Sequence, residues 1–389
     1  MTVDVNRVRE EAREIGRALA ELESKNRPAR VNRPLVKALG ESGLLARLFP
    51  RELGGSAQDR SGYASLLCAM REGLAAESTE ASMVMAVQAG ASSPLIQSGN
   101  DELIRRWIPG IAAGDVVPAF ALTEPDHGSD AGQLECRAEP EGDGWLLHGE
   151  KLWITNAPGA DIYTIFARTG TDPGSRGVSA FLVPAGAQGL SGEAVDLVKA
   201  HSVGRLLLDG VRVERDQMLG DPNRGFRSAM VTLDAARSAV GAAALGAGQA
   251  ALEMSVKHLQ SRRAFGGRLG DQQGIAHPVA DCAADLEASR LLIYESARAF
   301  DEGRSNVSHL SAMAKLAACK AAYAMVDQAI QVHGTIALET SHRLVPLYHE
   351  TRACLFEDGT TEITREVIMR NLIGRAPASN EGTSTRETS

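Results

Sequence analysis

The sequence has few aromatic residues and no cluster of cysteines. Its 389 residues include 3 Trp, 5 Tyr and 8 Phe, so aromatic side chains make up only 4% of the chain. The core must therefore be built from Leu, Val, Ile and Ala, and this composition favours close-packed helices. The five cysteines are scattered and no two form a CxxC pair. Neither a disulfide framework nor a zinc ribbon is predicted, no other metal site is predicted, and a reduced, cytoplasmic setting is the default.

A strong charge of one sign and a long apolar run are also missing. The chain has 41 basic and 49 acidic residues, a net charge of −8, and no basic run, which argues against binding to nucleic acid or to anionic lipid. Residues 1–17 are densely charged and lack the apolar segment of a signal peptide. The most apolar stretch, Ser238–Met254, is mostly Ala and Gly and falls short of the roughly 20 strongly apolar residues of a membrane span. We expect it to form a buried helix that neighbouring helices approach closely.

The pattern along the chain changes from helical to strand-like and back to helical. The length is about two to three times that of a usual domain, and the pattern predicts an α+β protein with an N-terminal helical domain (1–115), a middle β-barrel or sandwich domain (116–225) and a C-terminal four-helix bundle (226–374). Residues 375–389, rich in Ser, Thr and Glu, are expected to be a disordered tail. Long C-terminal helices are predicted over 226–262, 271–303, 308–334 and 361–372. Strands are predicted over 116–122, 134–138, 145–147, 162–167, 178–183 and 206–213, with a hairpin turn at Glu141–Gly144.

Two segments of the middle region could carry chemistry, and each also has an ordinary structural explanation. Leu122–Asp130 follows a strand and combines hydroxyls, a glycine and a turn proline. Such a loop can offer backbone N–H groups to an anion, or it can be a simple Asx-type turn. In Lys151–Asn156, Trp153 can lie against a flat aromatic ligand with Thr155 as a hydrogen-bond partner, or it can be a half-buried core residue.

Two further segments stand in the C-terminal region. Arg262–Gly267, followed by Asp271–Gln273, offers arginine for bidentate binding of phosphate, or it closes a helix at Gly266. Leu355–Ile363 is predicted to be a loop that leads into a helix. Asp358 on this loop could be a general base, or Asp358 or Thr360 could simply cap the helix.

The four segments, in this order, resemble the signatures of the acyl-CoA dehydrogenase family. The resemblance covers roughly residues 1–374, although His127 stands where a small residue is usual. It implies an oxidoreductase that removes an α-proton and a β-hydride from an acyl thioester, with non-covalent FAD between the β domain and the C-terminal helices. It also implies an acyl-CoA or acyl carrier protein substrate, an electron acceptor such as an electron-transfer flavoprotein, and a homotetramer.

The resemblance implies a set of cofactor-binding residues. Around the flavin ring and the phosphates it places Phe120, Leu122, Thr123, Gly128, Ser129, Trp153, Ile154 and Thr155. On the diphosphate and adenosine side, typically across a subunit contact, it places Arg262, Phe265, Gln273, Gln331, Val332, Gly334, Thr335, Thr360 and Glu362. Thr335 replaces the second glycine of the family's segment here, which removes a residue suited to close approach of the backbone to the diphosphate.

The catalytic base implied by the resemblance falls on Asp358, where the family usually has Glu. Aspartate is shorter by one methylene, and the adjacent Glu357 is an alternative base. Some members carry the base on the first long C-terminal helix, directly before an arginine. Ala236 occupies that position here, so this option is absent, and Arg237 is expected to lie near the base and tune it.

A second departure leaves the substrate open. Val198–Gly204 lacks the Met-Gly-x-Arg segment usual near the CoA diphosphate, although Lys199 and His201 could still meet phosphate. An acyl group on a carrier protein, as used by members in secondary metabolism, is therefore an option beside CoA. Two other functions remain open: a flavin oxidase or monooxygenase similar to nitroalkane oxidase, which uses Asp as its base, and a flavin-binding partner protein without activity. The sequence does not name the acyl group.

Overall fold

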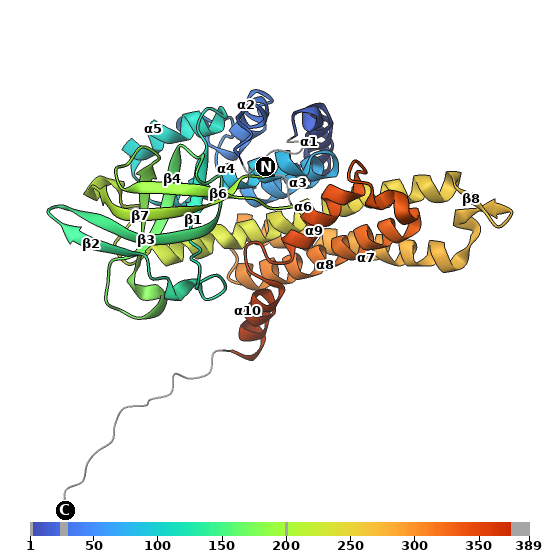
Figure 1. Ribbon diagram of the computed structural model, residues 1–389. Helices are drawn as coiled ribbons and strands as arrows, with labels where there is room; N and C mark the ends of the chain where they lie inside the picture. The colour runs from blue at the N-terminus through green and yellow to red at the C-terminus, as the bar shows by residue number, and fades with distance from the viewer. Residues whose placement is uncertain (1–2, 24–29, 199–200, 375–389) are drawn as a thin grey trace, which may run out of the picture.

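The computed structural model describes residues 3–23, 30–198 and 201–374 (Figure 1). Lys199 and the tail predicted to be disordered lie outside these described residues. Helices come first along the chain, then a sheet, then helices again, which confirms the predicted α+β class. Among the described residues, no helix is both long and apolar enough to cross a membrane.

The N-terminal helices are α1 (Val5–Leu19), α2 (Arg33–Glu41), α3 (Tyr63–Glu77), α4 (Thr79–Gln97) and α5 (Asp101–Ala112). Of these, α3 and α4 pack most extensively against the C-terminal helices. The Asn100 side chain accepts hydrogen bonds from the backbone N–H groups of Glu102 and Leu103, so it caps the start of α5. Helix α3 is buried over most of its length, and its buried residues include Arg71 and Glu72.

The middle region is one seven-stranded sheet that curls on itself. Its strands run in the order β1-β4-β2-β3-β7-β6, with β5 paired to the other side of β4. The predicted turn at Glu141–Gly144 joins β2 to β3 in antiparallel pairing. The strands are β1 (Pro118–Ala121), β2 (Arg137–Glu141), β3 (Gly144–Thr155), β4 (Ile162–Arg168), β5 (Val178–Pro184), β6 (Leu190–Val195) and β7 (Val203–Val213).

The C-terminal region is built around three long helices that lie side by side. They are α6 (Gly225–Ser261), α7 (Gln273–Asp301) and α8 (Val307–His333), followed by the shorter α9 (Leu344–Cys354) and α10 (Thr361–Ile373). A small hairpin of β8 (Arg263–Ala264) and β9 (Gly267–Arg268) joins α6 to α7 at the end of the molecule farthest from the large sheet (Figure 1).

Close approach to α6 depends on its glycines. A Cβ atom at Gly246 would lie 2.2 Å from the backbone oxygen of Glu72 on α3, and one at Gly241 would lie 2.4 Å from Ile293 on α7. The stretch Ser238–Met254 is therefore a buried segment of α6, as expected. This packing brings α3, α6 and α8 together beneath the loop between α9 and α10.

Candidate active site

The loop after β1 is held by a buried ion pair that the sequence analysis did not single out. Lys151 is 0% exposed and Glu124 is 4% exposed, and their charged atoms lie 2.7 Å apart. Lys151 also donates to the backbone oxygen of Leu122, while Glu124 accepts from the backbone N–H groups of Glu135 and Cys136. The pair therefore fastens the loop to strand β3 and fixes its path.

Trp153 is turned out of the sheet beside this loop. Its side chain is 53% exposed, and its φ of 61° lies in the left-handed region that a bulky residue seldom adopts. The pairing of β3 with β7 shifts register between Lys151 and Ile154, and the backbone N–H of Leu152 donates to Thr123 at 3.0 Å. Trp153 is therefore not a core residue, and an exposed indole beside Thr123 is a suitable surface for a flat ring.

The other expected residues of this group surround that surface. Ile154 and Leu122 are buried, Phe120 and Thr155 are half-buried, and Gly128 and Ser129 are exposed. The structure thus gathers the eight residues between Phe120 and Thr155 on two neighbouring segments.

A second group lies at the far tip of the C-terminal helices. Phe265 in the β8–β9 hairpin is 90% exposed with a φ of 53°, and Arg262 and Gln273 flank the hairpin as exposed residues. The rings of His258 and His333 lie 4.4 Å apart, so the end of α8 meets the end of α6 here. Exposed Gln331, Gly334 and Thr335 and buried Val332 belong to this tip.

The two groups are separated in a single chain. Figure 1 shows the hairpin at one end of the molecule and the large sheet at the other. Each group still suits FAD: the first offers an exposed aromatic face, and the second offers an exposed arginine and an exposed phenylalanine.

The loop between α9 and α10 carries Asp358. Asp358 and Gly359 have φ angles of 50° and 104°, and buried Lys315 on α8 donates from Nζ to the backbone oxygen of Gly359 at 2.6 Å. Thr360 is the residue that caps α10, because its side chain accepts from the backbone N–H of Ile363, and Glu362 is exposed in the first turn. Asp358 is therefore not needed as the helix cap.

Burial raises the pKa of the Asp358 carboxyl above its ordinary value, and the neighbouring charge of Glu357 raises this pKa further. The charges of Lys315, Arg71 and Arg237 act in the opposite direction. Asp358 is thus a half-buried carboxyl whose pKa is raised by burial, while three cationic side chains favour its ionised form.

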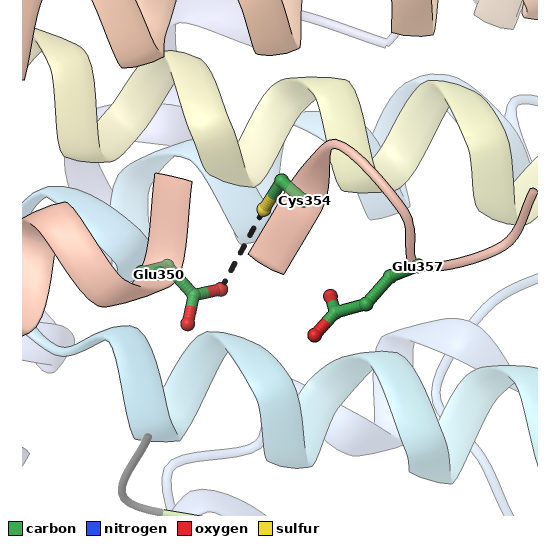
Figure 2. Close-up of side chains that lie close together, drawn as sticks. All are labelled: Glu350, Cys354 and Glu357. Carbon is green, nitrogen blue, oxygen red and sulfur yellow. Dashed lines mark hydrogen bonds between the residues drawn. The ribbon is translucent and has the colours of Figure 1, made fainter. Parts of the chain in front are cut away.

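Glu357 faces a different set of groups. Figure 2 shows its carboxylate directed toward Glu350 and Cys354 on α9, and the ligand atoms of these three side chains all lie within 4.8 Å of one another. The Cys354 thiol donates to Glu350 at 3.8 Å. Adjacent residues on the loop therefore place their carboxyls in unlike environments.

Two arginines lie near the loop, and only Arg237 was predicted from the sequence. Arg237 on α6 is 6% exposed and pairs with Asp234 at 2.7 Å. Arg71 on α3 is 1% exposed, and its Nε donates to the backbone oxygen of Ser82 at 3.3 Å. The adjacent charges of Arg71 and Glu72 inside a largely apolar helical stretch were the signal that could have revealed Arg71, but only the packing shows which groups it approaches.

Comparison with known proteins gives matches along almost the whole chain. The matching family descriptions are the acyl-CoA dehydrogenase N-terminal domain over residues 4–115, the middle domain over 119–211 and the C-terminal domain over 223–373. The mitochondrial short-chain specific acyl-CoA dehydrogenase of Rattus norvegicus is 38% identical over 87% of this chain and 82% of its own length.

A second relative and a solved structure extend this likeness. The caffeyl-CoA reductase-Etf complex subunit CarC of Acetobacterium woodii is 33% identical over 87% of this chain and 89% of its own length. The solved glutaryl-coenzyme A dehydrogenase in complex with glutaryl-CoA superposes with a TM-score of 0.89 at 28% identity, covering 98% of each chain.

Proposed function

Because the chain belongs to the acyl-CoA dehydrogenase family, whose members are FAD-dependent oxidoreductases, we propose that it dehydrogenates a short acyl thioester with Asp358 as the base. The observation that carries this assignment is the Asp358 carboxyl itself. It stands on a loop held by Lys315, near Arg71 and Arg237, in surroundings that raise its pKa. A raised pKa makes the ionised carboxylate a stronger base.

Each residue of the proposed site has its own role in the reaction. Asp358 receives the proton from the carbon next to the thioester carbonyl, and Arg237 and Lys315 stabilise the carboxylate before that transfer. Bound FAD supplies the acceptor for the β-hydrogen. Trp153 and Thr123 would orient the flavin ring, and the loop fastened by Lys151 would offer it backbone N–H groups and the Ser129 hydroxyl.

The remaining cofactor contacts come from a second copy of the chain. Arg262, Phe265, Gln273, Gln331 and Thr335 would hold the diphosphate and adenosine part of FAD bound mainly by the partner, while Thr360 and Glu362 extend the adenine side. The separation of the two groups within one chain supports this arrangement. The protein is thus a homo-oligomer, with a homotetramer as our specific expectation.

An electron-transfer flavoprotein is the proposed electron acceptor, since one relative is named as a subunit of a complex with such a protein. The acyl carrier is CoA or the phosphopantetheine arm of a carrier protein. A cytoplasmic location is consistent with five free cysteines.

Anaerobic stopped-flow reduction of the bound flavin by acyl thioesters tests the proposal. Asp358→Asn should retain FAD and lose about 10²- to 10⁴-fold in the rate of flavin reduction, whereas Glu357→Gln should lose far less. The reverse pattern would assign the base to Glu357. Because Asp358 is an aspartate, a small nitroalkane should be tried as well: rapid peroxide production from it, without reduction by any thioester, would favour a flavin oxidase.

A further inference from the structure

Three histidines stand in a row at the tip of the C-terminal helices. His258 belongs to the last turn of α6, His333 ends α8, and His342 lies just before α9. The centre of the His333 ring lies 4.4 Å from that of His258 and 5.6 Å from that of His342. All three side chains are half-buried. The row therefore joins the ends of α6 and α8 to the start of α9.

The row links the two segments that we propose for cofactor binding at this tip. The backbone N–H of Arg262 donates to the backbone oxygen of His258 at 2.8 Å, so His258 supports the start of the β8–β9 hairpin. His333 stands two residues before Thr335. A shift of the end of α6 against the end of α8 would therefore displace one group of FAD contacts relative to the other.

The hydrogen bonds of the row suit neutral imidazoles. Nδ1 of His342 accepts from the backbone N–H of Leu344 at 3.2 Å, so a proton on this nitrogen would remove the bond. Nδ1 of His333 donates to the backbone oxygen of Ala329 at 2.7 Å, which leaves Nε2 as the nitrogen that can take up a proton. Rings at these distances pack together when neutral and repel each other when two of them carry a charge.

We propose that His258, His333 and His342 form an acid-sensitive latch, which holds the FAD-binding tip together at neutral pH and opens with loss of FAD when two of the rings are protonated. This inference rests on the proposed function, because it takes the tip to hold the diphosphate and adenosine part of FAD bound mainly by a second copy of the chain.

The charges that act on the row set the direction of the effect. Burial, His333 and Arg262 lower the pKa of His258, and burial and His333 lower the pKa of His342, while Glu339 acts against this second shift. The ordinary pKa of histidine is 6.5. The stabilisation given by the closed row is therefore complete above pH 6.5 and is lost as the pH falls below 6.5 through the lowered values.

Two further charged pairs stand on elements next to the row. Asp271 ends a short 3₁₀ helix that packs against α6, and it pairs with Arg268 at 2.8 Å. Arg343, the neighbour of His342, pairs with Glu77 on α3 at 3.5 Å. An arginine already neutralises each of these carboxylates, so neither would offset the repulsion between protonated rings.

FAD binding measured across pH tests the latch. In the FAD-loaded wild-type protein, the dissociation constant of FAD, followed by the fluorescence of released cofactor, should rise at least about 10-fold from pH 7.5 to pH 5.5. The double variant His258→Phe/His333→Asn keeps a ring and a hydrogen-bond donor at these positions but takes up no proton there. Its dissociation constant should be the same at both pH values. His258→Lys places a permanent charge beside His333 and should bind FAD weakly at pH 7.5 as well.

Two controls separate a local latch from a general effect of acid. His277→Gln changes an exposed histidine of α7 outside the row and should keep the pH dependence of the wild-type protein. Circular dichroism of the wild-type protein should show the same helix content at both pH values. A loss of helix in step with the loss of FAD would reject the latch.

Other results would also overturn the inference. A wild-type dissociation constant that does not rise in acid, or a double variant that keeps the full rise, would reject the latch and leave the proposed function standing. Protein that binds no FAD at pH 7.5 would reject the proposed function and this inference with it. If the double variant does not fold, His258→Phe alone decides the question, because it removes the repulsion with His333 and should reduce the rise.

Discussion

Lys315 Nζ donates to the backbone oxygen of Gly359 at 2.6 Å, across the space between α8 and the loop that carries Asp358. Lys315 is 1% exposed, and Asp358 and Gly359 both have backbone angles in the left-handed region. Such angles persist in a non-glycine residue only where the surroundings impose them. The buried lysine therefore positions the candidate base through the backbone of the next residue.

Replacing this lysine should slow proton removal without releasing FAD. In Lys315→Met the loop loses a charge-assisted hydrogen bond, which should cost about 1.5–3 kcal/mol of stability. The loss of a positive charge near Asp358 should also raise the apparent pKa in the pH profile of flavin reduction. The control is Lys320→Met, an exposed residue of the same helix. A rate and a pH profile equal to those of wild type would show that Lys315 does not position the base.

The raised pKa of Asp358 predicts how activity depends on pH. The base must be ionised before it can accept a proton, so the rate of flavin reduction should fall as the pH drops through a value above 3.8, the ordinary pKa of aspartic acid. Stopped-flow rates measured from neutral pH down to the acid limit of folding would show this limb. A rate that stays constant down to the acid limit of folding would contradict the assignment.

The raised pKa of Asp358 also predicts how stability depends on pH. Ionisation of the carboxyl, which activity requires, should lower the stability of the fold. A carboxyl with a raised pKa in the folded state holds its proton more tightly than in the unfolded chain, so its contribution to stability is full below 3.8 and is lost as the pH rises through the folded-state pKa. Asp358→Asn mimics the protonated form and should therefore have a higher Tm than wild type at pH 7. The difference should shrink toward pH 4. A lower Tm at both pH values would show that the charged carboxylate is instead stabilising.

The ion pair of Lys151 and Glu124 should be worth several kcal/mol when one partner is removed. Lys151→Met leaves Glu124 buried among groups that cannot neutralise it, which typically costs about 3–5 kcal/mol. The double variant with Glu124→Gln should recover part of the loss, and urea unfolding of all four proteins completes the cycle. Glu150 lies next to Lys151 on β3 and pairs with Arg205 of β7 at a more exposed place. Glu150→Gln should change stability by less than about 1 kcal/mol. Equal losses of stability in Lys151→Met and Glu150→Gln would show that the buried pair is worth no more than the exposed one.

Local pattern was enough to predict most elements, and the exceptions have physical reasons. Helices predicted over 226–262 and 308–334 end within one residue of α6 and α8, because long apolar segments bounded by glycine carry strong signals. Helix α9 was not predicted, since Pro346, His349 and Arg352 interrupt its apolar pattern. Strand β6 was also missed, because it is a largely exposed strand at the end of the sheet and shows no alternation.

Site residues could be predicted where they belong to one recognisable segment of the sequence. They could not be predicted where packing brings distant segments together. Asp358 and Trp153 were identified from the segments around them, and Arg237 from its place after Ala236. Arg71, Lys315 and the Lys151–Glu124 pair act on residues far away in sequence, so only the packing of α3 and α8 and the course of strand β3 reveal them. Nor could the sequence show that the two groups of cofactor residues lie at opposite ends of one chain.

That separation leads to a prediction about subunits. If each FAD is held by Trp153 of one chain and Arg262 of another, Trp153→Glu and Arg262→Glu should each abolish FAD binding when expressed alone. Co-expressed with different affinity tags, the two variants should form mixed oligomers in which one site combines the intact group of each chain. The mixed species should therefore be yellow and should reduce its flavin with substrate, while each variant purified by itself should not.

Doubly tagged wild-type protein and doubly tagged single variants are the controls for this complementation. The mixed species should release one FAD for each site that is built from two intact groups. The remaining sites carry both changes and should bind no FAD. Light scattering on the wild-type protein should give a tetramer. A stable monomer with bound FAD, or mixed oligomers that stay colourless, would mean that one chain closes around its own cofactor, and the tip residues Arg262 and Phe265 would then need another explanation for their exposure.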